Sequence, residues 1–89
     1  MMMTDRMQRA MIWRLVDREQ ELSTFDLARL GEPWRSIYQY VLTQAGAHED
    51  REDALAAAIG QTSLVDRAKP NYWDQINNEI DKMELAAKF

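Results

Sequence analysis

The sequence contains no cysteine, which excludes disulfide bonds, cysteine-based zinc sites and thiol chemistry. The longest apolar run, residues 54–59, is far shorter than the roughly 20 residues that a membrane-spanning helix needs. The first residues lack the basic and then apolar order of a secretory signal. We therefore expect a cytoplasmic protein without a membrane partner.

An excess of positive charge is also absent. The 11 Lys and Arg residues face 15 Asp and Glu residues, so the net charge is −4. Within residues 1–46 six arginines balance six acids, whereas within residues 47–89 five cations face nine acids, so the whole net charge of −4 lies in the second half. Arginine binds phosphate groups and guanine edges well. The neutral first half therefore permits phosphate binding, and the acidic second half opposes it.

Glycine and proline are scarce, with three and two residues, and no stretch alternates apolar and polar residues as a half-buried strand does. We expect an all-α fold: one compact domain over residues 1–89, with five or six helices and a helix-turn-helix-like half over residues 1–46. An acidic helical half follows over residues 47–89. The expected helices cover residues 4–21, 24–30, 33–45, 49–59 and 64–69, and then the chain from Pro70 onward.

Capping residues mark several helix ends. Thr4, Ser23 and Ser63 are suitable N-caps, and Gly31 and Gly46 are suitable stops. On the first helix, one apolar side is predicted to carry the following residues: Met7, Met11, Ile12, Leu15, Val16 and Leu22. These local signals predict which segments are helical and which side of each helix is buried.

The last helix carries an apolar stripe with spacings of 3, 4, 3 and 4 residues. The stripe consists of Trp73, Ile76, Ile80, Met83 and Ala87. Such heptad-like spacing is typical of helices that pack lengthwise against another helix. The stripe could cover the core of the domain or pair with a second copy in a homodimer.

The segment over residues 12–46 contains the sequence Asp26-Leu27-Ala28 followed by Gly31, between two longer helical stretches. This segment, about 40% of the chain, resembles a helix-turn-helix DNA-binding unit. In such a unit Ala28 is small because two helices cross closely, and Gly31 provides a left-handed turn. The resemblance implies a transcriptional or replication regulator that binds double-stranded DNA.

The resemblance also implies that the helix over residues 33–45 enters the major groove of the DNA. Its inward positions would be Ile37 and Val41. The residues expected to read bases are Arg35, Ser36, Gln39 and Thr43. Arg14 and Arg29 are expected to contact phosphates.

A helical protein–protein interaction module, an adaptor or a subunit without DNA binding, is the alternative. The segment from Leu30 to Arg35 also resembles the Leu-Gly-x-x-Trp-Arg segment of death domains, a class of six-helix interaction bundles. Candidate interface residues are Trp13, Trp73, Ile76, Ile80 and Met83, with Trp13 the aromatic most suited to face a partner. Packing in the core is the competing interpretation for the tryptophans, and Trp34 is expected to lock its helix onto the first helix.

Residues for catalysis or metal binding are hard to find. The chain has no glycine-rich phosphate loop and no nucleophile elbow. His48 is the only histidine, so it cannot form a typical transition-metal site alone. It begins a polar run that ends at Asp53, and this run predicts the solvated start of a helix. We therefore expect no enzyme activity, no cofactor, no metal site and no small-molecule substrate.

The DNA-binding hypothesis predicts that Arg35→Ala weakens binding to duplex DNA and leaves the fold intact. Binding should also weaken steeply as salt rises, because phosphate contacts release counterions. Electrophoretic mobility shifts with duplex DNA at low salt measure both effects. If no duplex gives a shifted complex at low salt, the DNA-binding hypothesis is wrong.

Overall fold

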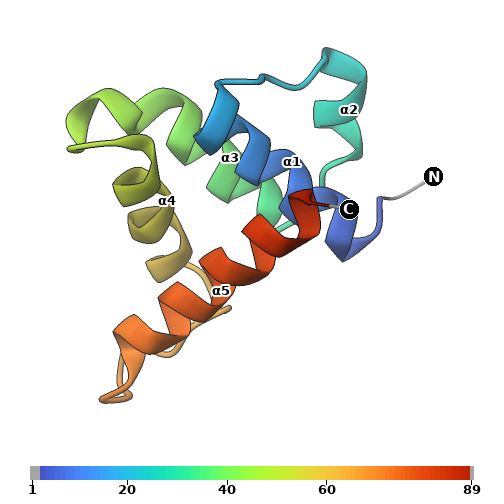
Figure 1. Ribbon diagram of the computed structural model, residues 1–89. Helices are drawn as coiled ribbons and strands as arrows, with labels where there is room; N and C mark the ends of the chain where they lie inside the picture. Colours follow the sequence, from blue (N-terminus) through green and yellow to red (C-terminus); the bar gives the residue numbers. More distant parts are fainter. Residues whose placement is uncertain (1–2, 89) are drawn as a thin grey trace.

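A computed structural model describes residues 3–88, and within this range the chain forms helices, turns and no strand, which confirms the all-α prediction. The elements are α1 (Asp5–Arg18), α2 (Thr24–Arg29), α3 (Trp34–Gln44), the 3-10 helix η1 (Ala45–Ala47), α4 (Arg51–Gly60) and α5 (Tyr72–Ala87). Figure 1 shows α5 running along α1, with α3 and α4 completing the bundle and α2 standing to one side.

The expected N-caps of the first two helices are confirmed. The side chain of Thr4 accepts a hydrogen bond from the N–H of Met7, and that of Ser23 accepts one from the N–H of Asp26. Helix α1 ends at Arg18, before the expected residue 21, because Glu19 adopts a left-handed conformation with a φ of 55°. The N–H of Glu19 then binds helix carbonyls and closes the last turn.

The two expected boundaries of α3 differ in detail. The helix begins at Trp34, after a cis Glu32–Pro33 peptide bond. At its other end Gly46 is not the stop, because the chain continues from α3 directly into η1. Helix α4 begins after Asp50, whose carboxylate accepts the N–H of Asp53 at 2.7 Å. A side-chain cap therefore sets the start of α4 two residues later than expected.

The helix expected over residues 64–69 is wrong, since residues 61–70 form turns. Side chains accept hydrogen bonds from two backbone N–H groups here. Gln75 Oε1 accepts one from the N–H of Asp66 at 2.8 Å, and Asp66 Oδ1 accepts one from the N–H of Ala68 at 2.9 Å. Such local hydrogen bonds compete with helix formation. Helix α5 accordingly begins at Tyr72 rather than at Pro70.

The buried side of α1 differs from the predicted one at its beginning. Ile12, Leu15 and Val16 are buried as expected, but Met7 is 42% exposed and Gln8 is buried in its turn of the helix. The amide of Gln8 is fully engaged, since its Nε2 donates to the Met3 carbonyl at 3.2 Å and its Oε1 accepts the N–H of Gly31 at 2.7 Å. A buried amide with both partners satisfied ties α1 to the loop after α2.

The stripe on α5 covers the core, which is the first of the two roles predicted for it. Ile76, Ile80 and Met83 are 1%, 6% and 0% exposed. They are therefore not free to pair with a second copy while the bundle is intact. Trp73 does not belong to the buried stripe: it is 66% exposed and packs edge-on against Tyr72.

The contact between α1, α3 and α5 centres on Trp34, which is 4% exposed. The guanidinium of Arg9 lies 4.5 Å from the centre of the Trp34 ring, and it binds Glu79 of α5 at 2.6 Å. A cation over an aromatic ring and a shielded ion pair reinforce one another here. Trp34 thus joins α3 to α1, as the sequence predicts.

Tyr38 supplies the first test of this packing. Its ring is 1% exposed, and its Oη accepts the N–H of Leu22 at 2.8 Å. We expect Tyr38→Phe to lower the free energy of unfolding by about 1–2 kcal/mol, because a half-buried N–H loses its acceptor. Urea denaturation measures this loss. Tyr40→Phe is the matched control, with a change within about 0.5 kcal/mol, since its partner His48 can turn to water. Equal losses in the two variants would contradict the assignment.

Candidate functional site

The outward face of α3 carries three of the predicted DNA-reading residues. Ser36, Gln39 and Thr43 are all exposed. The hydroxyl of Ser36 donates to Glu32 at 2.6 Å, and that of Thr43 donates to the Gln39 carbonyl at 2.8 Å. The sequence therefore predicts this polar face well, but the face carries no Lys or Arg.

Arg35 is turned away from that face. Its Nη2 donates to the carbonyls of Leu27 and Ala28 at 3.3 and 3.1 Å, at the end of α2. Its Nε is buried and has no hydrogen-bond partner among residues 3–88. Helix C-terminal carbonyls carry partial negative charge and attract a guanidinium. Arg35 is thus a capping residue for α2, and the expected outward, base-reading orientation is not found.

The predicted tight turn between α2 and α3 is also different. Ala28 is exposed, so no close helix crossing requires its small side chain. No glycine in the described range has a positive φ, so Gly31 does not form a left-handed turn. Helix α2 buries none of its residues. The packing that the helix-turn-helix resemblance implies is therefore missing at this corner.

The two predicted phosphate-binding arginines lie in different places. Arg29 pairs with Asp26 at 3.4 Å and lies over the ring of Phe25 at 5.3 Å. Arg14 lines a hollow formed only by residues of α1 and α5. The structure therefore does not bring these arginines together with the outward face of α3.

A groove of about 1060 Å³ lies between the end of α1, α3 with η1, and the start of α4. We call it the acidic groove. Its apolar lining consists of Trp13, Leu15, Val16, Val41, Leu42 and Ala45. Its carboxylates are those of Asp17, Glu19, Glu21, Glu49, Asp50 and Glu52. Within this lining Arg51 is the one Lys or Arg, so negative charge dominates.

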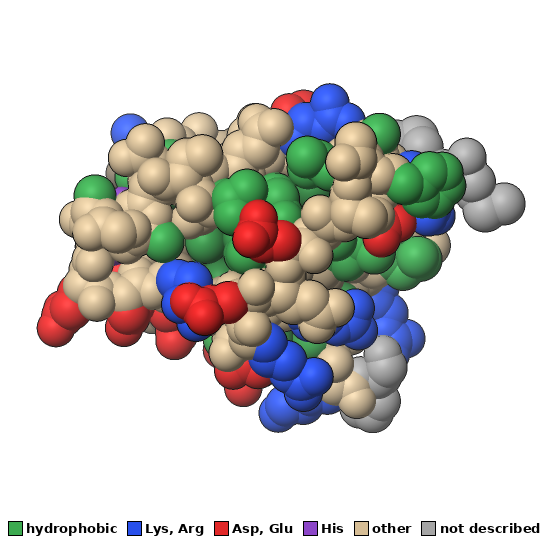
Figure 2. All heavy atoms as spheres, turned by 90° about the horizontal axis from the view of Figure 1, so that it is seen from above, with side chains coloured by type: hydrophobic (Ala, Val, Ile, Leu, Met, Phe, Trp, Pro, Cys, Tyr) green, Lys and Arg blue, Asp and Glu red, His purple; other side chains and the backbone are tan. Residues whose placement is uncertain are grey.

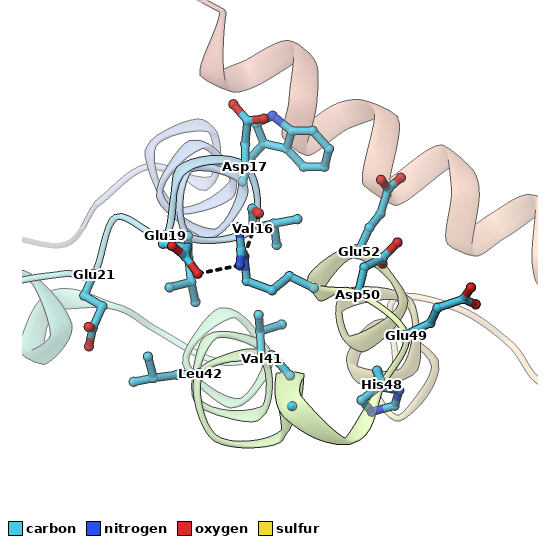
Figure 3. A pocket seen from close by; sticks show the side chains of 15 residues that line it. Val16, Asp17, Glu19, Glu21, Val41, Leu42, His48, Glu49, Asp50 and Glu52 are labelled. Atoms are coloured by element: carbon cyan, nitrogen blue, oxygen red, sulfur yellow. Dashed lines mark hydrogen bonds and ion pairs between the residues drawn. The ribbon is translucent and has the colours of Figure 1, made fainter.

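The carboxylates of the acidic groove come from two segments. One set follows the end of α1, and the other begins α4, so they lie on both sides of the opening (Figure 3). Arg51 joins the two sides: its Nε donates to the Val16 carbonyl at 2.9 Å, and its Nη1 binds Glu19 at 2.7 Å. The dashed lines in Figure 3 mark these two bonds. The remaining five carboxylates have no cation in the lining.

Two smaller hollows of about 400 and 280 Å³ lie on the other part of α1, against α5. They share Arg6 and Ala86, so they form one continuous area, which we call the basic surface. It consists of Arg6, Met7, Arg9, Ala10, Met11, Arg14, Lys82, Leu85 and Ala86, and no carboxylate lines either hollow. Figure 2 shows a group of Lys and Arg beside the grey chain ends and a row of Asp and Glu at the lower left.

The candidate interface residues divide between these surfaces and the core. Trp13 is half-buried and lines the acidic groove, whereas Trp73 is exposed at the start of α5, away from it. Exposed apolar side chains that the sequence did not single out are Phe25, Leu42 and Leu85. Leu42 lines the acidic groove and Leu85 the basic surface. Helical periodicity could have indicated their outward position, but not their neighbours.

Over residues 3–88 no cluster of three His, Asp or Glu side chains has the geometry to hold a metal ion. The ring of His48 instead forms a hydrogen bond of 3.0 Å with Tyr40 Oη. In the same part of the chain no helix combines the length and apolar character that crossing a bilayer requires.

No protein-family model, curated protein or solved structure matches this chain. The surfaces of this molecule that could bind a partner are the acidic groove, the basic surface and the outward face of α3. Of these, the acidic groove combines apolar area with a lining in which six carboxylates face one cation, Arg51.

Arg51 is expected to hold the two sides of the acidic groove together. We predict that Arg51→Lys lowers the free energy of unfolding by about 1–2 kcal/mol, because one ammonium cannot replace both bonds of the guanidinium. Urea denaturation measures the effect. The matched control is Arg18→Lys: Arg18 is 73% exposed, and its contact with Asp17 is 3.6 Å, so we expect a change within about 0.5 kcal/mol. An Arg51→Lys variant as stable as the control would show that the bridge contributes nothing.

Proposed function

We propose that this chain is a helical protein–protein interaction module whose acidic groove binds a basic amphipathic helix of a partner. The observation that carries the proposal is the presence of six carboxylates on two sides of a groove whose lining includes the exposed Leu42 and the half-buried Trp13. An apolar floor contributes binding free energy through burial, and a charged rim selects the partner and speeds its approach.

The lining of the groove suits such a helix. Leu42, 42% exposed, and the half-buried Trp13 offer apolar contacts in the lining. Carboxylates on both sides favour a helix whose apolar stripe is flanked by Lys or Arg on both sides. Amphipathic helices in apolar grooves are a common mode of peptide recognition.

DNA binding by α3, with a role in transcription or replication, stays a prediction with less support. Ser36, Gln39 and Thr43 are exposed and could contact base edges. However, the same helix borders the acidic groove through Leu42, and the carboxylates of the groove repel phosphates. The test below distinguishes binding of a basic helix from binding of an acidic peptide or of DNA.

The test uses a fluorescently labelled 14-residue peptide of leucine and lysine with an amphipathic helical pattern. Fluorescence anisotropy should show binding that weakens as salt rises, because salt screens the rim charges. The double variant Asp17→Lys/Glu49→Lys should bind at least tenfold more weakly. Both positions are exposed, and Lys in the last turn of α1 suits the helix dipole, so the fold should persist.

The matched control is Asp81→Lys/Glu84→Lys, which changes the net charge equally on α5, outside the groove. It should bind like the native chain, and a leucine–glutamate peptide should not bind. Equal affinities for the groove variant and this control would overturn the proposal. Duplex DNA binding that is lost on Gln39→Ala would instead favour the DNA-binding alternative.

A further inference from the structure

We propose that one occupant of the acidic groove is the basic surface of a second copy of this chain, so that copies associate head to tail. The inference rests on the proposed function, since it uses the same groove, and it names the partner. The surface that would face the groove is the area on α1 and α5 described above.

The basic surface has the chemistry that the acidic groove requires. Its lining contains no carboxylate and four cations, namely Arg6, Arg9, Arg14 and Lys82. Arg9 is largely buried and paired with Glu79, which also lies 3.6 Å from Lys82, so one shielded carboxylate behind the surface offsets part of this charge. Met7 and Leu85, 42% and 57% exposed, leave apolar area between these cations. The groove offers the reverse pattern, with carboxylates around apolar residues. The two surfaces are therefore complementary in charge, and each has apolar area to bury.

The two surfaces of one molecule cannot fold onto each other, because both lie on the same helix. On α1 the basic surface extends from Arg6 to Arg14, and the groove extends from Trp13 past the end of the helix. A straight helix of 14 residues is about 21 Å long, and α1 is held in the core along its length. Contact between these surfaces must therefore join different molecules.

The contact would be heterologous, because each molecule offers a different surface to each neighbour. Such contacts produce open chains, or rings when the rotation between neighbours closes. The net charge of −4 opposes association in general, so binding depends on the local pairing of opposite charges. We therefore expect association that grows with protein concentration and weakens with salt.

The test measures mass by sedimentation velocity over a range of protein concentrations. The native chain should rise above 10.4 kDa with concentration, and high salt should return it to that mass. A groove variant, Asp17→Lys/Glu49→Lys, and a surface variant, Arg14→Glu/Leu85→Glu, should each stay at 10.4 kDa. General charge repulsion predicts the opposite for the groove variant, since its net charge is smaller.

The decisive experiment mixes the two variants. The groove variant keeps its basic surface and the surface variant keeps its groove, so a 1:1 mixture should form a complex of about twice 10.4 kDa and nothing larger. Circular dichroism checks that both variants fold. Leu85→Ser alone, at an exposed position, replaces the surface variant if that one does not fold.

Two results would overturn the inference: a native chain that stays monomeric at every concentration, or two folded variants that do not associate when mixed. If the native chain is monomeric but its groove still binds the leucine–lysine peptide, the self-association is wrong and the proposed function stands. If the native chain neither self-associates nor binds the peptide, both the inference and the proposed function are wrong.

Discussion

The packing of α1 along α5 is the constraint on which the other features depend. Arg9 stands at its centre, stacked on Trp34 of α3 and paired with Glu79 of α5 at 2.6 Å. With its inner side fixed in this way, α1 must turn its remaining surface outward. Arg6, Arg9 and Arg14 of this helix then line the basic surface, and Asp17 near its end lines the acidic groove. One helix thus contributes to both charged surfaces.

Local signals in the sequence account for most of the fold. The caps Thr4 and Ser23 and the buried part of the α5 stripe follow from interactions within a few residues, so they can be predicted without tertiary contacts. The turns over residues 61–70 could not, because the side chain of Gln75 reaches back from α5 to the N–H of Asp66. A capping pattern in the sequence does not reveal this hydrogen bond, which competes with helix formation.

The candidate site was less predictable for the same reason. Its carboxylates come from residues 17–21 and 49–52, and only the packing of α4 against α1 and α3 brings these runs together. Either run alone looks like a solvated helix end. The orientation of Arg35 shows the converse: its position on α3 suggested outward exposure, but the carbonyls of α2 attract its guanidinium. Charge and periodicity predict which face of a helix is exposed, whereas tertiary contacts determine which charged residues of different helices lie on the same surface.

Helix α2 has no fully buried residue, and of its side chains Leu27 packs, partly buried, against the core. Regions with few buried contacts open locally at little free-energy cost, without unfolding the rest of the molecule. The amide hydrogens of α2 should accordingly exchange with solvent much faster than those of α1 or α5. Two bonds from Arg35 hold the end of this six-residue helix, so that guanidinium links the stability of α2 to the position of α3.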